Sequence, residues 1–378
     1  MRSFAPFAMA LALAACSSVP PRPVAADAES LPQRLVDAPS AARRDELIRT
    51  AIAALLERRY AEAERDAVTA LAIDPRAPRA LAVRGMAVLQ RARRTEPPDL
   101  QLAEAGETDA VLAAQLAPAD AFVGWLHAAL LAETGHLSAA AAAADAALER
   151  CAAAPPAERA ALLGIAGTYR YELGEERAAL PLLQAYTGLR PGDATAHYRI
   201  GACLLRIAQV PTGPRGPLVA QQQAEAAAAA FERSVQLAPQ DLDAALAIGT
   251  AWLRAAELAG ERKDDAVRDR HRAAAVQLYQ RLAAEWPQAA EPCFRLGIAA
   301  EAALDRPAAR AAYAAALERD AEHLGALLNL ANLALADDDR SSAAGLLQRA
   351  LAVPAERSDL RDAERKRIAE RLRNLTVR

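Results

Sequence analysis

The sequence predicts an all-α protein built as an array of repeated helix pairs. Ala and Leu supply most of the apolar residues and aromatic residues make up only 4% of the chain, so helix is favoured because these side chains lose little entropy in it. Small residues and prolines recur at intervals of about 34 residues. With 378 residues, the chain is long enough for one extended array.

Charge and hydropathy limit the classes of protein that the chain can represent. A formal net charge of −3 argues against a non-specific nucleic-acid binder, which normally carries a basic face. After the apolar stretch at the N-terminus, no window is apolar for the length that a bilayer crossing needs. We therefore expect no internal transmembrane helix and no nucleic-acid partner.

The N-terminus has the pattern of an export signal. Arg2 is followed by an apolar stretch, residues 4–15, of the length of a secretory signal peptide. Residues 13–16, "LAAC", resemble the lipobox of bacterial lipoproteins. The resemblance implies that a signal peptide of residues 1–15 is removed and that Cys16 is lipidated, and Ser17 behind it implies an outer-membrane lipoprotein facing the periplasm. The alternative is ordinary secretory cleavage nearby, which leaves Cys16 a simple thiol.

Residues 16–43 are predicted to form the lipidated cysteine and a tether. The stretch is rich in Pro, Ser and Ala and lacks helical periodicity. We expect a semi-extended segment that holds the rest of the chain away from the membrane.

Residues 58–75, "RRYAEAERDAVTALAIDP", resemble the second half of a tetratricopeptide repeat (TPR), a helix–turn–helix unit. The resemblance extends over residues 44–356 and implies a right-handed superhelical TPR solenoid of about eight repeats. A charged C-terminal segment, residues 357–378, is predicted to be a capping helix and tail, although contact with anionic lipid or a partner is an alternative. The eight predicted repeats of the TPR array are residues 44–77, 78–120, 121–154, 160–193, 194–241, 242–289, 290–323 and 324–356.

The glycines give this resemblance its strongest support. In a TPR, the two helices of a repeat meet at the eighth and twentieth positions, where Gly or Ala lets the backbones approach. The chain has only 17 glycines, yet glycine fills five of the eight slots at the eighth position. The residues in that column are Ala51, Gly85, Ala128, Gly167, Gly201, Gly249, Gly297 and Ala331.

Repeats five and six carry insertions. The first, residues 208–223, "AQVPTGPRGPLVAQQQ", contains three prolines and two glycines and is predicted to be a loop. The second, residues 258–272, is densely charged and predicts two prolonged helices that form a finger. Insertions in solenoids fall at one edge, so the two should lie side by side. They serve either as surface elaboration or as a partner contact.

No motif for catalysis, metal binding or phosphate binding is present. The five histidines form no HExxH or Cys/His cluster, and there is no GxxxxGK[ST] or GxSxG sequence. We therefore expect no enzyme, cofactor or metal. Cys203 and Cys293 lie in first helices two repeats apart, too far for a disulfide, and we expect both, with Cys151, to be free and at least partly buried.

The TPR resemblance implies a concave groove lined by positions 2, 5, 9, 12 and 13 of the first helices. At position 13, Glu133 and Glu172 are followed by Arg206 and Arg254, which predicts that the arginines bind an acidic or C-terminal carboxylate partner. The alternative is that all are ordinary solvated residues. The predicted partner-binding residues are Trp125, Tyr171, Tyr198, Arg206, Leu246, Arg254, Phe294 and Asn332.

Together these features predict a membrane-anchored periplasmic scaffold that binds protein partners through a TPR groove. Lipoproteins of this build serve in pilus or secretin assembly, polysaccharide export or cell-wall enzyme complexes, and the sequence does not choose among these roles. The alternative is a soluble periplasmic or cytosolic TPR regulatory adaptor without a lipid anchor. No small-molecule substrate is expected.

Overall fold

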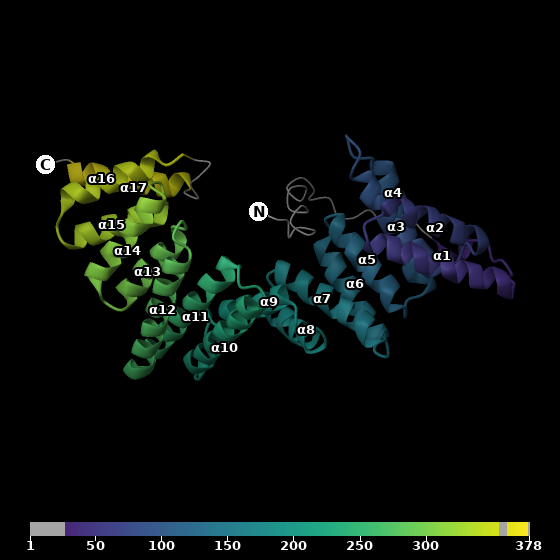
Figure 1. Ribbon diagram of the computed structural model, residues 1–378, viewed down its shortest axis with the longest axis horizontal. Helices are drawn as coiled ribbons and strands as arrows, with labels where there is room; N and C mark the ends of the chain where they lie inside the picture. Colours follow the sequence, from purple (N-terminus) through teal and green to yellow (C-terminus); the bar gives the residue numbers. More distant parts are fainter. Residues whose placement is uncertain (1–26, 355–360, 377–378) are drawn as a thin grey trace. The chain divides into compact units, whose positions relative to one another are not determined.

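The computed structural model describes residues 27–354 and 361–376 of the chain (Figure 1). Within these ranges the regular elements are 17 α-helices and one short 3₁₀ helix, and there is no strand. The predicted all-α class is confirmed. The chain divides into two compact units, residues 1–192 (unit 1) and 193–378 (unit 2).

Unit 1 consists of four antiparallel helix pairs, and in each pair the two helices pack against each other. Each pair also packs against the next one within the unit. The pairs are α1 (Ala38–Leu56) with α2 (Tyr60–Ile73), α3 (Pro78–Ala92) with α4 (Leu100–Leu116), α5 (Ala121–Glu133) with α6 (Leu137–Arg150), and α7 (Pro156–Glu172) with α8 (Glu176–Leu189).

Unit 2 consists of four further pairs and one C-terminal helix, α17 (Asp362–Thr376), which packs on α16. Arg365 of α17 donates hydrogen bonds to the carbonyls of Leu351 and Val353, at 3.3 and 3.0 Å, and so satisfies acceptors at the end of α16. The two units together have the eight helix pairs of the predicted TPR solenoid. The pairs are α9 (Ala194–Ile207) with α10 (Gly216–Leu237), α11 (Leu242–Glu261) with α12 (Asp265–Glu285), α13 (Glu291–Ala302) with α14 (Arg306–Arg319), and α15 (Leu324–Ala336) with α16 (Arg340–Ala352).

Glycines at the eighth repeat position lie where the first helix touches the second. A Cβ atom added to Gly249 would lie 2.3 Å from Cζ of Tyr279, and one added to Gly85 would lie 2.6 Å from the carbonyl oxygen of Gly106. Both distances are too short for any side chain larger than hydrogen. The close approach of the two helices predicted from the glycine column is confirmed.

The prediction of a tether up to residue 43 needs correction. Residues 28–30 form the 3₁₀ helix, and the N–H of the buried Ala28 donates to the side chain of Gln115 on α4 at 3.0 Å. Arg76 donates to the carbonyl of Ala28, also at 3.0 Å. Helix α1 begins at Ala38 because the Asp37 side chain caps it. The chain therefore contacts the rest of unit 1 already at Ala28, and Cys16 lies outside the described residues.

The insertion of repeat five is helical over half of its length, so the prediction of a loop over residues 208–223 is wrong. Only residues 208–215 lie between α9 and α10. Pro217 falls in the first turn of α10, where its missing N–H costs nothing, and the Ala and Gln residues after it favour helix. The prolonged helices of repeat six are confirmed, because α11 and α12 have 20 and 21 residues.

The three cysteines of the described ranges, Cys151, Cys203 and Cys293, are buried and form no disulfide, as predicted. Across the same residues, no helix combines the length and apolarity required to span a bilayer.

Candidate protein-binding site

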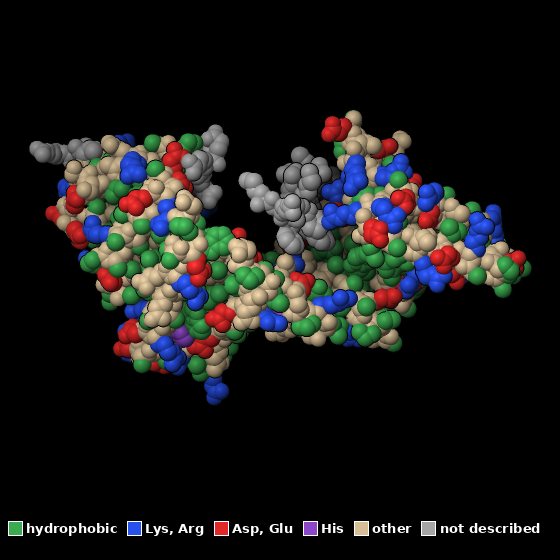
Figure 2. Space-filling view, viewed as in Figure 1, with side chains coloured by type: hydrophobic (Ala, Val, Ile, Leu, Met, Phe, Trp, Pro, Cys, Tyr) green, Lys and Arg blue, Asp and Glu red, His purple; other side chains and the backbone are tan. Residues whose placement is uncertain are grey.

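An aromatic pair lies on the first-helix face of unit 1. Phe122 and Trp125 of α5 are both half-buried, with ring centroids 5.8 Å apart. Asp120 fixes where α5 begins, because its carboxylate accepts hydrogen bonds from the N–H groups of Phe122 and Val123 at 3.0 and 3.2 Å. The start of the helix in turn sets the direction in which Phe122 and Trp125 point. Residues three apart on a helix share one face. Figure 2 shows hydrophobic side chains gathered in a hollow over α5.

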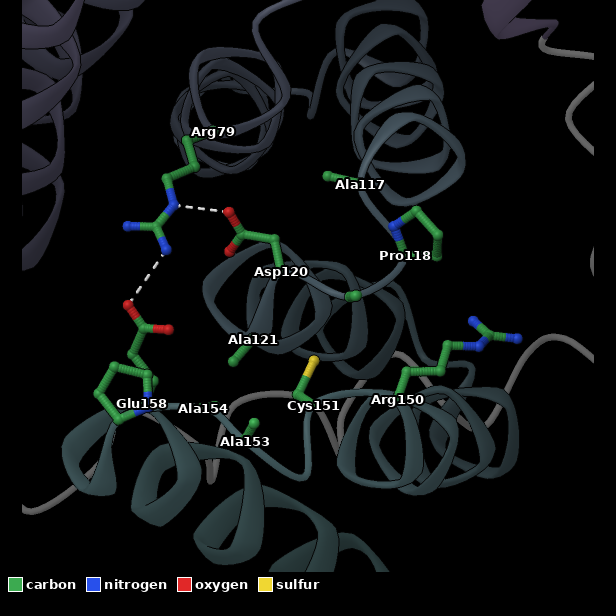
Figure 3. A pocket seen from close by; sticks show the side chains of 12 residues that line it. Arg79, Ala117, Pro118, Asp120, Ala121, Arg150, Cys151, Ala153, Ala154 and Glu158 are labelled. Carbon is green, nitrogen blue, oxygen red and sulfur yellow. Dashed lines mark hydrogen bonds and ion pairs between the residues drawn. The ribbon is translucent and has the colours of Figure 1, made fainter.

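Arg79 of α3 connects this aromatic pair to the neighbouring repeats. Its guanidinium carbon lies 5.5 Å from the centroid of the Phe122 ring. Its Nε donates to Asp120 at 2.7 Å, and its Nη2 donates to Glu158 of α7 at 3.1 Å (Figure 3). The hydrogen bond to Asp120 raises the pKa of Arg79, with a further contribution from Glu158. One side chain thus joins α3, α5 and α7.

A recess of about 570 Å³ opens beside Arg79. It is lined by the α4–α5 connection, the end of α6 and the start of α7. Arg79 and Arg150 lie on opposite sides of it, and Cys151 lies between them (Figure 3). Burial raises the pKa of the Cys151 thiol, which therefore stays protonated and is a poor nucleophile. The recess is therefore a concave site with the hydrogen-bond donors Arg79 and Arg150 at its edges.

The other predicted residues of unit 1 have different surroundings. Tyr171 is half-buried in the last turn of α7, a helix that packs against α5. Glu133, at the end of α5, forms an ion pair with Arg93. That pairing neutralises the acidic charge that the sequence places at this groove position.

Two predicted partner-binding residues of α11 need correction. Leu246 is only 7% exposed, and its carbonyl accepts the Tyr279 hydroxyl at 3.1 Å. Arg254 donates through Nε and Nη2 to the carbonyl of Ala208, at 3.2 and 3.0 Å, just beyond the end of α9. Removing a leucine side chain from water lowers the free energy of the folded state. An arginine beside a helix C-terminus satisfies carbonyls that have no partner within the helix. Both side chains stabilise unit 2 and are not exposed to a partner.

The remaining predicted residues of unit 2 are half-buried or exposed. Tyr198 packs against Phe231 of α10 at 5.4 Å between centroids. Asn332 is exposed and accepts a hydrogen bond from Arg371 of the capping helix α17 at 2.8 Å. Arg206 is exposed in the last turn of α9. Phe294 is half-buried between α13 and the start of α15, where its ring lies 4.6 Å from that of His323.

Arg79, Asp120 and Glu158 were not among the residues that the sequence indicated. Arg79 occupies the second position of repeat two, equivalent to Phe122 in repeat three, so the repeat pattern contained the signal for it. Asp120 and Glu158 lie outside the groove positions of the pattern and become visible only in three dimensions. Within the described ranges, no group of three or more His, Cys, Asp or Glu side chains could hold a metal ion.

Neither a protein-family model nor a curated protein matches the sequence. Among solved structures, the chain is similar to YrrB, described as a TPR protein with an unusual peptide-binding site, at 19% identity over 58% of this chain and 95% of that one, with a TM-score of 0.43. The similarity to PilF of Pseudomonas aeruginosa is 14% identity over 66% of this chain and 94% of that one, with a TM-score of 0.44. A tetratricopeptide repeat protein from Parabacteroides merdae gives 14% identity over 88% of this chain and 99% of that one, with a TM-score of 0.41. At these identities the similarity says nothing about function.

Proposed function

We propose that the chain is a lipid-anchored scaffold of the bacterial cell envelope that binds protein partners on the first-helix face of unit 1 and supports the assembly of an envelope machine. The observation that carries the proposal is the half-buried pair of Phe122 and Trp125, held beside Arg79 and the recess. Aromatic and arginine side chains contribute most of the binding energy at many protein interfaces.

The site favours a partner segment with both apolar and hydrogen-bond-accepting groups. Apolar side chains of the partner would cover the exposed parts of the Phe122 and Trp125 rings. The Nη1 atom of Arg79 takes part in neither of its two carboxylate contacts and points away from them in Figure 3. It is therefore placed to donate to a carbonyl or carboxylate of a bound segment.

The proposed anchor is Cys16. Diacylation of its sulfur and acylation of the new N-terminus would add more than one acyl chain, which is what stable membrane attachment requires. Such an anchor gives a scaffold without catalytic residues a fixed location. Without the anchor, the same binding face belongs to a soluble periplasmic or cytosolic adaptor.

Partner binding is tested by comparing two tryptophan variants of the tagged full chain. Trp125→Ala removes the centre of the aromatic pair, whereas Trp286→Ala removes a half-buried Trp at the end of α12, outside the first helices. We expect Trp125→Ala to weaken the recovery of co-purifying partners about thirty-fold, as for a binding hot spot, and Trp286→Ala to retain them. Retention of every partner by Trp125→Ala would contradict the proposal.

The anchor is tested separately by metabolic labelling with an acyl analogue. The wild type should incorporate the label and fractionate with membranes, and Cys16→Ser should do neither. Unlabelled wild type would establish the soluble adaptor instead, without bearing on the binding face.

A further inference from the structure

The insertions of repeats five and six form one connected platform in unit 2. Helices α10, α11 and α12 have 22, 20 and 21 residues, whereas α13 to α16 have 12 to 14. The added turns enclose a small apolar core of their own. Its members are Ala208, Ala220, Ala224, Ala255 and Leu258.

Polar contacts join the same helices. The buried Gln221 of α10 accepts a hydrogen bond from Arg262, at the end of α11. The buried His271 of α12 lies with Nε2 3.0 Å from Glu225 of α10, and its ring stacks on Trp252 of α11 at 5.0 Å. Buried polar networks of this kind hold elements in one arrangement. The three helices of the platform are therefore held in one arrangement.

The platform carries a group of exposed apolar side chains, which we call the insert patch: Val210, Leu218 and Val219. They are 66%, 37% and 47% exposed. The α9–α10 connection folds back on itself, because a Cβ atom added to Gly216 would lie 3.2 Å from Cβ of Pro211. This close approach brings Val210, the residue before Pro211, near the first turn of α10. The other large exposed hydrophobic residues of the described ranges occur singly, at Leu35, Leu56, Val68, Leu100, Leu189 and Leu304.

An exposed arginine, Arg215, lies beside the insert patch. Arg215 is the single charged residue between Ile207 and Ala224, in a chain of which 25% is charged. It is exposed, and no described carboxylate forms an ion pair with it. Lys263, in the α11–α12 turn, is also exposed and outside any ion pair with a described carboxylate, although Glu261, Asp264 and Asp265 lie in the same turn. The contact of Arg262 with Gln221 places that turn at the same edge of unit 2 as the start of α10 (Figure 1).

We propose that the insert patch binds a protein segment whose apolar side chains are flanked by Asp or Glu. The apolar side chains cover Val210, Leu218 and Val219, and the carboxylates pair with Arg215 and Lys263. This is a second binding site, independent of the α5 face. Because the helices of the platform already hold one arrangement, binding requires little ordering of Leu218 and Val219 on α10. A membrane surface fits less well, since each basic residue contributes only about 1 kcal/mol there and two are present.

The test uses a phage library of random short peptides selected on the immobilised full chain. The enriched peptides should combine apolar residues with Asp or Glu. One enriched peptide is then synthesised with a fluorescent label, and its Kd for the chain is measured by fluorescence anisotropy. Leu218→Ser with Val219→Ser should raise this Kd about ten-fold or more, and Arg215→Glu should raise it about five-fold. The control is Val68→Ser on α2, a valine of matching exposure (46%), which should leave the Kd unchanged.

Enrichment of basic peptides, or of peptides whose Kd does not respond to the patch variants, would overturn the proposal. So would the absence of any patch-dependent peptide. A parallel arm measures sedimentation with phosphatidylglycerol vesicles. Sedimentation that is lost on Leu218→Ser with Val219→Ser would assign the patch to a membrane instead. Circular dichroism of each variant confirms that these surface changes leave the helices intact.

Discussion

Trp125 in unit 1 and Phe294 in unit 2 occupy the same position of their repeats but have different surroundings. Trp125 lies next to Phe122, whose ring is covered by Arg79 at the edge of a recess. Phe294 lies over Gly325, where an added Cβ would be 2.6 Å from its ring, and beside His323. The glycine in the following repeat thus makes room for the Phe294 ring against the start of α15. The equivalent of Gly325 after Trp125 is Ala161, and Trp125 packs instead at the edge of an apolar cluster that includes Cys151 and Leu162.

Arg79 of unit 1 and Arg254 of unit 2 also differ in the groups that they contact. Arg79 holds two carboxylates and lies over an aromatic ring at the edge of a recess. Arg254 instead holds a backbone carbonyl just beyond the end of α9. A repeat position therefore indicates which face a residue lies on, whereas its neighbours decide whether it binds or packs.

The largest effects should come from exchanging the two aromatic residues for alanine. Phe294→Ala should lower the free energy of unfolding of unit 2 by about 2 kcal/mol, somewhat less than for a fully buried Phe, and leave partner binding intact. Trp125→Ala should weaken partner binding by about 2 kcal/mol. Urea denaturation and partner recovery measure the two quantities. A loss of binding in Phe294→Ala would erase the distinction between the faces.

Gly249→Ala should lower the free energy of unfolding by about 2 kcal/mol, because its Cβ would overlap the Tyr279 ring. The matched control is Gly188→Ala in α8, where an added Cβ meets nothing within 4 Å. That change should raise the free energy of unfolding by about 0.5 kcal/mol, from helix propensity. Equal effects at the two glycines would show that helix contact does not explain the glycine column.

Arg254→Gln should cost about 1 kcal/mol of stability, since it removes hydrogen bonds that close the end of α9. Arg150→Gln, an exposed arginine at the edge of the recess, should leave stability within about 0.5 kcal/mol of the wild type. Thermal unfolding compares both with the wild type. If Arg254→Gln instead leaves stability unchanged but abolishes partner binding, Arg254 is a binding residue as the sequence indicated.

The smallest effect should be a pH dependence at Glu291. Its hydrogen bond with His323, supported by Arg295, lowers the pKa of Glu291. A carboxylate with a lowered pKa in the folded state stabilises the protein above the unfolded value of 4.5, and this contribution is lost as the pH falls through the folded pKa. Glu291→Gln should therefore melt at a slightly lower temperature than the wild type at pH 7. The difference should disappear under acid conditions, and its persistence there would point to packing.

The fold was predictable from the sequence because the repeat signals are local and periodic. Glycines such as Gly249 mark the helix contacts directly. The binding face was less predictable, because the burial of Leu246 depends on contacts between helices that no column of the pattern records. The start of α10 is not evident in the sequence, because the prolines of the insertion are typical of loops, although Pro217 is compatible with a first helical turn. The docking of Ala28 is a contact distant in sequence with no local signal.

Site-specific photocrosslinking tests most directly whether Trp125 of unit 1 contacts a partner while its equivalent in unit 2, Phe294, packs within the unit. A photoreactive phenylalanine analogue is placed at position 125 or at position 294 of the full chain, and adducts with other proteins are compared. We predict adducts from position 125 and none from position 294. Adducts from position 294 with none from position 125, or equal yields from both, would show that Trp125 is not the partner-binding residue of the pair.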